Sequence, residues 1–267
     1  MIPKESDLKP TYGQSVTVTV EGPVALVRFD RGVNRNAINQ DTLLALTQVA
    51  RDLGDALDIQ VVVLTGAADI FSAGIDLKDP AKWNEDDQAL LQRRDMAQRG
   101  ARLCRAWESL PQLTIAAIEG MVVGGAAALT LACDWRVASS QAAFYLPEVK
   151  VGLNMGWGAI PRLTSLLGAA RAKRAILLGE KLGAAQALDW GLVDVISEPG
   201  RAVEDAQALA RKTAETPAAL LRMTKESVNA CATALHHPSI YMDADQALVC
   251  RDSQEGRSAR QQFVQAG

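Results

Sequence analysis

Two adjacent glycines, Gly124 and Gly125, are the residues whose type and position most directly indicate chemistry in this chain. They follow an apolar, strand-like segment at residues 113–118 and precede a run of small residues typical of a helix. Without a Cβ, the backbone at such a turn can approach a ligand closely, and the first N–H groups of a helix are unpaired and partly positive. The turn therefore suits an oxyanion, although a close contact between helix and strand would also require small residues.

Two further segments place polar groups beside apolar ones. Residues 60–66 have the composition of a buried strand and are followed by a turn around Gly74. Farther along, Glu148 lies within the otherwise apolar stretch of residues 143–152. Desolvation there would raise the pKa of Glu148 toward values useful for acid–base catalysis. The alternative interpretation is a surface glutamate at a strand end or a structural ion-pair partner.

The elements that would position these residues alternate along the chain. Residues 15–20 and 24–29 have the pattern of a hairpin, and residues 41–57 have helical periodicity, with Asn39 or Asp41 as the cap. Further strands are expected from residues 61, 113 and 135, and an arginine-bearing helix is expected up to residue 107. Strands that alternate with helices predict an α/β architecture with parallel strands.

Taken in order, these segments resemble the enoyl-CoA hydratase/isomerase family, the crotonases, over nearly the whole chain. Each matching piece is short and weak by itself, but their order and separations are those of the family. The pieces are NRNAI (34–38), LTG (64–66), SAGID (72–76), Gly120 with Gly124 and Gly125, ACD (132–134), LPE (146–148), PRL (161–163) and AQAL (185–188) followed by GLVD (191–194).

The resemblance implies a crotonase-like spiral of ββα units followed by a C-terminal helical region. We expect the core domain to span residues 1–197 and the helical, trimerising region to span residues 198–267. The resemblance further implies a homotrimer or a hexamer. From about residue 198 the pattern is helical throughout, with breaks expected at Thr216-Pro217 and His237-Pro238.

In this family, two backbone N–H groups polarise the thioester carbonyl of an acyl-CoA. By position, these groups belong to Ile75 and Gly125, and Glu148 is the proton carrier. Removal of a proton beside a thioester puts negative charge on the carbonyl oxygen, so two preorganised donors lower the barrier. The resemblance therefore gives Glu148, Ile75 and Gly125 as the catalytic residues.

The sequence departs from the family's hydratases at Ala128, three residues after Gly125. Hydratases carry a second glutamate at that position, and the two carboxylates hold the water that is added. Alanine cannot transfer a proton, whereas one glutamate is enough to move a proton along an allylic system. The leading prediction is therefore 3-enoyl/2-enoyl-CoA isomerisation. Four alternatives stay open: an enoyl-CoA hydratase, an aryl-propenoyl-CoA hydratase or lyase, an acyl-CoA thioester hydrolase, and a non-catalytic homologue that binds CoA or RNA.

The resemblance also suggests residues that bind the CoA part of the substrate. The family holds CoA beside the turn that contains Asp76, Leu77 and Lys78. We expect Asp76 to brace this turn, and Lys78 and Arg35 are candidates for contacting a CoA phosphate. The family's C-terminal nucleotide-binding lysine has no evident counterpart, and the remaining cationic candidates near the C-terminus are Arg257 and Arg260.

Two aromatic residues stand where the family usually has small ones. Tyr145 replaces a common glycine, and Trp157 lies in the stretch NMGWG (154–158). Each is either part of the core or a wall that narrows the acyl pocket. In the second case, the Tyr145 phenol is a candidate second acid.

Composition limits the class of protein. A chain of 267 residues that is 48% hydrophobic and 22% charged can bury one substantial core. The net charge of −3 argues against a general nucleic-acid or membrane-surface role, and the arginines of residues 93–105 are assigned to a solvated or packed helix. The four cysteines and two histidines lack metal-ligand spacing, so we expect no metal and no cofactor, with CoA entering as part of the substrate. Residues 1–7 lack an apolar leader, which favours a cytoplasmic protein.

Overall fold

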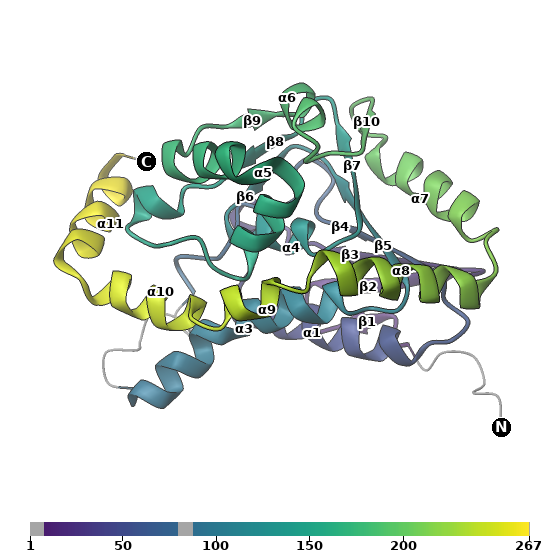
Figure 1. The fold of residues 1–267 in the computed structure, drawn as a ribbon, viewed down its shortest axis with the longest axis horizontal. Coiled ribbons are helices and arrows are strands. Elements are labelled where there is room, and N and C mark those ends of the chain that lie inside the picture. The colour runs from purple at the N-terminus through teal and green to yellow at the C-terminus, as the bar shows by residue number, and fades with distance from the viewer. Residues whose placement is uncertain (1–7, 80–87, 267) are drawn as a thin grey trace.

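The computed structural model describes residues 8–79 and 88–266 and is shown in Figure 1. Residues 1–7, on which the prediction about a leader depends, lie outside the described residues. In chain order the elements are β1 (Thr11–Tyr12), β2 (Val16–Glu21), β3 (Val24–Phe29), η1 (Asn34–Asn36), α1 (Gln40–Asp55), β4 (Val61–Thr65), α3 (Leu90–Glu108), β5 (Leu113–Ile118), β6 (Met121–Val123), α4 (Gly125–Leu131), β7 (Trp135–Ser139), β8 (Ala143–Tyr145), η2 (Glu148–Val151), α5 (Ala159–Leu178), β9 (Leu182–Gly183), α6 (Ala184–Asp189), β10 (Val195–Ser197), α7 (Ala202–Thr213), α8 (Ala218–Ala232), α9 (His236–Ile240), α10 (Asp243–Asp252) and α11 (Gln254–Ala266).

The main sheet of the described residues has the strand order β1-β2-β3-β4-β5-β7-β10. Strands β1, β2 and β3 pair antiparallel, and the β2–β3 hairpin confirms the prediction for residues 15–29. From β3 to β10 all pairs are parallel, as alternation with helices requires. A smaller sheet, β6-β8-β9, contains the strand β6 that leads into the Gly124–Gly125 turn.

Both faces of the main sheet are buried at β4, which explains the unbroken apolar sequence of this strand. Val62 and Leu64 point into a large core shared with α1, α3, α4 and α5. Val61 and Val63 point the other way, into a second core that is closed by α7. The helix α7 follows the expected boundary at residue 197 and packs on the sheet, so it is part of the same packing unit as the strands.

Helix starts follow local chemistry in two places that the sequence had indicated. Asn39 caps α1, because its side-chain oxygen accepts a hydrogen bond from the N–H of Thr42 at 2.9 Å. Pro217 immediately precedes α8, which confirms the break at Thr216-Pro217. The break expected at His237-Pro238 is wrong: Pro238 lies in the first turn of α9, where a missing N–H costs nothing.

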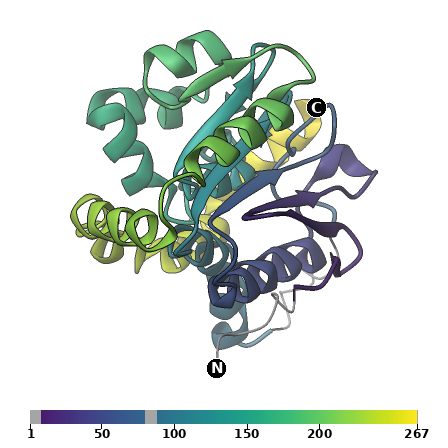
Figure 2. The same cartoon turned by 90° about the vertical axis from the view of Figure 1, so that its right-hand side faces the viewer.

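The C-terminal helices fold back over the helices of the core. Helix α10 packs on α3, and α11 packs on η2 (Figures 1 and 2). The contact between η2 and α11 is backbone against backbone, because a Cβ on Gly152 would collide with the carbonyl of Gly256. No helix in the described part of the chain is long and apolar enough to cross a membrane.

The arginines of α3 are engaged by acidic neighbours. Arg93 pairs with Asp252 at 2.8 Å and Arg94 with Asp245 at 2.6 Å, and both aspartates belong to α10. Within α3 itself, Asp95 pairs with Arg102 at 2.7 Å. The first two arginines of this helix therefore attach α10 to the core.

Candidate active site

Two turns that are distant in sequence form one wall of a cavity. The N–H of Ser72 donates to the carbonyl of Met121, and the N–H of Val123 donates to the carbonyl of Ser72, both at 3.1 Å. Gly74, two residues after Ser72, has φ +88°, and a Cβ there would lie 2.7 Å from the carbonyl oxygen of Val123. The Ile75 turn therefore packs directly against the strand that leads into α4.

The N–H of Ile75 points into this cavity. The carbonyl of Gly74 accepts from the N–H of Ile38 at 2.6 Å, and the N–H of Asp76 donates to the carbonyl of Ile38 at 2.9 Å. Since a trans peptide holds its N–H opposite its C=O, the N–H of Ile75 faces away from Ile38. It has no hydrogen-bond partner among the described residues, and Ile75 lines the cavity.

A second free donor comes from the start of α4. The carbonyl of Gly124 accepts from the N–H of Ala128 at 3.0 Å, so the N–H of Gly125 in the same peptide points out of the helix. Gly124 has φ +52° and ψ −118°, a conformation that side chains disfavour, and its own N–H donates to the carbonyl of Tyr145 at 2.9 Å. Gly125 lines the same cavity as Ile75, so their two N–H groups can both donate hydrogen bonds to one oxyanion.

Glu148 lies at this turn. A Cβ built on Gly124 would lie 2.6 Å from Oε1 of Glu148, so only glycine leaves room for the carboxylate. Although the residue as a whole is half-buried, its Oε2 is inaccessible to water and has no hydrogen-bond partner within the described chain. Burial raises the pKa of Glu148 from 4.5 to about 7, and only its own backbone N–H acts in the opposite direction.

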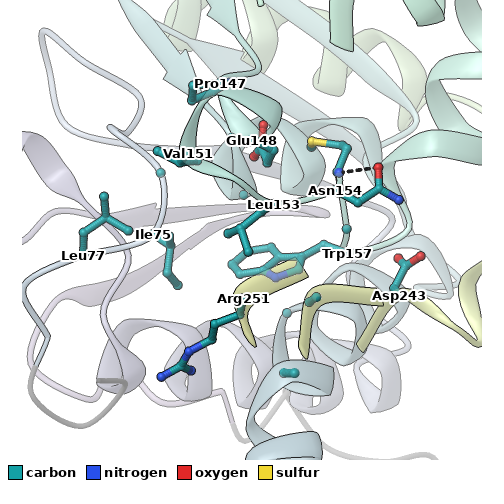
Figure 3. Close-up of a pocket in the computed structure, with 18 of the residues that line it drawn as sticks. Ile75, Leu77, Pro147, Glu148, Val151, Leu153, Asn154, Trp157, Asp243 and Arg251 are labelled. Carbon is teal, nitrogen blue, oxygen red and sulfur yellow. Dashed lines mark hydrogen bonds between the residues drawn. The ribbon is translucent and has the colours of Figure 1, made fainter. Parts of the chain in front are cut away.

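The cavity has a volume of about 250 Å³ and a mainly apolar lining. Its walls come from α1, α3, the Ile75 turn, the start of α4, η2 and the C-terminal helices α10 and α11. Figure 3 shows Glu148 above the indole of Trp157, with Ile75 to the left. The structure thus brings six of the residues expected at the site into one cavity: Ile75, Leu77, Gly125, Tyr145, Glu148 and Trp157.

Comparison with known proteins identifies the family. Residues 19–266 match the family described as enoyl-CoA hydratase/isomerase. The chain belongs to this family.

Individual members resemble the chain over most of its length. The short-chain-enoyl-CoA hydratase of Clostridium acetobutylicum is 32% identical over 216 residues, which are 80% of this chain and 81% of the relative. DspI of Pseudomonas aeruginosa superposes with a TM-score of 0.77 and 31% identity and covers 98% of both chains. An enoyl-CoA hydratase from Mycobacterium avium subsp. paratuberculosis gives a TM-score of 0.84 at 25% identity, over 95% of this chain and 97% of the other. The crotonase fold expected from the sequence is confirmed.

Asp76 braces the Ile75 turn and does not line the cavity. Its carboxylate pairs with Arg31 at 2.7 Å and accepts from the side chain of Asn34 at 3.3 Å and from the N–H of Lys78 at 2.9 Å. Burial acts to raise the pKa of Asp76, but these hydrogen bonds outweigh it and lower the pKa. Asp76 is therefore held as a carboxylate that fixes the turn.

Two cations expected at the CoA phosphates lie beside the cavity. The side chain of Lys78 is exposed next to the Ile75 turn. Arg35 is exposed as well and lines a separate hollow with Gly120 and Met121, while its carbonyl accepts from the N–H of Ala73 at 3.0 Å. Contact of Lys78 or Arg35 with CoA stays a prediction.

The sequence analysis missed several lining residues that come from helices distant in the chain. Gly100 of α3 lies against the indole of Trp157, and Asp243 opens α10. Arginines from three helices also line the cavity: Arg93, Arg251 and Arg260. Of these, only Arg260 had been a candidate, because nothing in the spacing of α3 or α10 marks a residue as facing a site.

Ala128 is fully buried in the core and does not line the cavity. Among the described residues, Glu148 and Asp243 are the carboxylates that do. Figure 3 shows that these two side chains lie well apart. Asp243 accepts a hydrogen bond from the N–H of Gly158 at 2.7 Å. Glu148 therefore has no carboxylate beside it to share a water.

Two aspartates of the matching motifs, Asp134 and Asp194, have structural contacts. Asp134 accepts from the N–H of Thr114 at 2.7 Å and from Nζ of Lys225 at 2.6 Å, which ties α8 to the sheet. Asp194 accepts from the N–H of Arg136 at 2.7 Å. Neither residue lines the cavity.

Proposed function

We propose that this protein is an acyl-CoA-processing enzyme that isomerises 3-enoyl-CoA to 2-enoyl-CoA, with Glu148 as its single acid and base. The observation that carries this proposal is the buried, unpartnered carboxylate of Glu148 beside two free N–H donors. A reaction that adds water needs a second group, because one group takes a proton from the attacking water while the other gives a proton to C2. The position at which the family's hydratases have that group, Ala128, lies in the core.

The reaction follows from three groups. The thioester oxygen accepts hydrogen bonds from the N–H groups of Ile75 and Gly125. Glu148, as the carboxylate, removes a proton from C2 of the 3-enoyl group, and the electron pair passes to the carbonyl oxygen to give a dienolate. Glu148, now protonated, returns the proton to C4, and the double bond is left between C2 and C3. The two N–H donors stabilise the oxyanion throughout.

The pKa of Glu148 suits this sequence. With a value of about 7, carboxylate and carboxylic acid coexist near neutral pH, so one group can act first as base and then as acid. The mainly apolar cavity keeps bulk water from the dienolate.

CoA is the part of the substrate that must meet the solvent. We assign its phosphates to the exposed side chains of Lys78 and Arg35 beside the Ile75 turn, together with Arg260 of the cavity. Leu77 and Asp76 follow Ile75 and would run along the pantetheine chain. No separate cofactor is needed for proton transfer.

Assembly into a homotrimer or hexamer is part of the proposal. Large apolar side chains are exposed along the C-terminal helices in a single copy of the chain, among them Leu220, Met223, Val228, Leu235 and Val249. A second copy would bury such side chains favourably. We further propose that the enzyme is cytoplasmic and that the trimer contacts come from residues 198–267, although α7 within this range also packs on the main sheet.

Hydration is the second candidate, because the relative from Clostridium acetobutylicum is named a short-chain-enoyl-CoA hydratase. In this chain the extra acid would have to be the phenol of Tyr145, which lines the cavity. Alanine at position 128 makes this the weaker candidate.

The test is direct turnover of two substrates. We expect 3-hexenoyl-CoA to give 2-hexenoyl-CoA, separated by chromatography, and crotonyl-CoA to give only traces of the 3-hydroxyacyl product. In deuterated water, the isomerised product carries deuterium at C4 to the extent that Glu148 exchanges its proton. Rapid hydration of crotonyl-CoA without isomerisation would assign the protein to the hydratases. No turnover of either substrate would reject both functions.

A further inference from the structure

The backbone at Trp157 has a conformation that a residue with a large side chain rarely adopts. Its φ is +60°, and outside residues 34–36 it is the one non-glycine residue with positive φ in the described ranges 8–79 and 88–266. Such a conformation is unfavourable for a residue with a side chain and persists only where the surroundings impose it. The position of the indole is therefore held by the rest of the fold.

A clamp on the Trp157–Gly158 peptide supplies that restraint. Nη1 of Arg162 donates to the carbonyl of Trp157 at 3.0 Å, and the N–H of the same peptide donates to Oδ2 of Asp243 at 2.7 Å. Arg162 is in turn fixed by two hydrogen bonds to Glu108, at 2.7 and 2.8 Å. Both polar groups of one peptide are thus bound by charged side chains from α5 and α10.

The indole itself fits between two glycines. A Cβ on Gly100 would overlap its pyrrole side, and a Cβ on Gly125 would lie 2.9 Å from Cη2 and Cζ3 of its six-membered ring. Trp157 therefore leaves no room for a side chain at position 125, and this restriction is separate from the clash with a ligand that the sequence had suggested. The six-membered ring therefore lies on the side of the first turn of α4 to which a side chain of residue 125 would point.

A side chain at position 128 would be directed at this same place. Side chains on a helix lean toward its N-terminus and cover the preceding turn. The N–H of Ala128 donates to the carbonyl of Gly124 and closes the first turn of α4, and this turn contains Gly125. A glutamate at 128 and the indole of Trp157 would therefore need the same volume.

We propose that Trp157 determines the choice of reaction in this cavity, by filling the space that a second carboxylate and its water would occupy. Ala128 and Trp157 then form one coupled pair, in which the small residue in the helix is required by the large residue in front of it. The proposal rests on the proposed function in placing the substrate at Glu148, but it concerns only the exclusion of hydration and does not require that the wild-type protein isomerises 3-enoyl-CoA.

Two double-mutant cycles test the coupling. The first uses Ala128→Glu, Trp157→Gly and the double variant, because glycine accepts the left-handed backbone of residue 157 without strain. We expect Ala128→Glu alone to hydrate crotonyl-CoA no better than wild type, and the double variant to exceed Ala128→Glu at least tenfold. Efficient hydration by Ala128→Glu with Trp157 in place would overturn the proposal, and so would a double variant no faster than Ala128→Glu.

The second cycle needs no catalytic activity. Ala128→Met introduces an apolar side chain nearly as long as that of glutamate, and unfolding by heat is measured with Trp157 and with Trp157→Gly. We expect Ala128→Met to lower Tm in the first background and to lower it at most half as much in the second, since neighbours that share a space are non-additive. An equal loss in both backgrounds would overturn the coupling. A wild-type protein that does not isomerise 3-enoyl-CoA would instead count against the proposed function.

Discussion

Two glutamates, Glu108 and Glu148, have pKa values that are shifted in opposite directions from that of an ordinary glutamate. Both oxygens of Glu108, at the end of α3, accept hydrogen bonds from Arg162, and Nδ1 of His236 lies 3.6 Å from Oε1. Burial acts to raise the pKa of Glu108, but the hydrogen bonds and charge of Arg162, with a smaller contribution from His236, lower it. Glu148 has no such cation among the described residues, and burial raises its pKa to about 7.

The difference shows that burial alone does not make a reactive acid. A cation within hydrogen-bond distance converts a buried glutamate into a fixed anion that holds other groups, here the clamp on Trp157 through Arg162. A glutamate buried without one keeps a proton available near neutral pH. In this protein the partner, more than the depth of burial, separates the structural carboxylate from the one that we propose to be catalytic.

The largest expected effect comes from neutralising the unpartnered acid. Glu148→Gln keeps the size of the side chain but removes its basicity, so turnover of 3-enoyl-CoA should fall by about 10²–10⁴-fold. Binding of an acyl-CoA, measured by calorimetry, should stay close to wild type. Wild-type kcat/KM should rise as pH passes through about 7, because the carboxylate form is the base.

Glu108→Gln is the matched control for this experiment, because it changes the paired carboxylate in the same way. It should preserve the rise of kcat/KM near pH 7. A Glu148→Gln protein that turns over like wild type would make Glu148 structural and remove the contrast between the two residues.

The next effect concerns the donor beside Glu148. Gly125→Pro removes one N–H at the first position of α4, where proline fits the helix, and should lower kcat/KM by about 10²–10³-fold. Gly125→Ala keeps the N–H but places a Cβ 2.9 Å from Trp157, so it measures the steric part alone. Equal rates for the alanine and proline variants would show that the N–H of Gly125 does not contribute.

Stability should change in opposite directions at the two glutamates. Since the folded pKa of Glu108 is lowered, its contribution to stability is present above pH 4.5 and is lost as the pH falls. Glu108→Gln at pH 8 leaves Arg162 buried without its anion and should lower the free energy of unfolding by about 3 kcal/mol. Chemical denaturation at pH 8 measures this loss, and a change of less than about 1 kcal/mol, as for an exposed pair, would contradict it.

The smallest expected effect is a gain. The folded pKa of Glu148 is raised, so its stabilising contribution is complete below pH 4.5 and is lost as pH rises through about 7. Glu148→Gln should therefore increase the free energy of unfolding at pH 8 by on the order of 2–3 kcal/mol, and the gain should shrink toward pH 5. A variant less stable than wild type at pH 8 would mean that Glu148 has a cationic partner in solution.

Sequence motifs were sufficient to predict the order of strands and helices and to bring Ile75, Gly125 and Glu148 together. These residues lie in turns directly after strands, and turn chemistry is local. Gly100 and Asp243 could not be predicted, because their roles depend on how α3 and α10 pack around Trp157. The same long-range packing supplies a reason for a glycine at position 125 that the sequence could not show: a Cβ there would lie against the indole of Trp157.

The contact of Gly152 with Gly256 has a consequence for the folding of the chain. Helix α11 packs on η2, the turn that carries Glu148, although the two elements are distant in the sequence. Until α11 docks, water can reach η2, and Glu148 should have the acidity of an ordinary glutamate. We therefore expect a folding intermediate in which the sheet has formed but α11 has not docked to be inactive toward acyl-CoA, and to acquire its base only when α11 packs on η2.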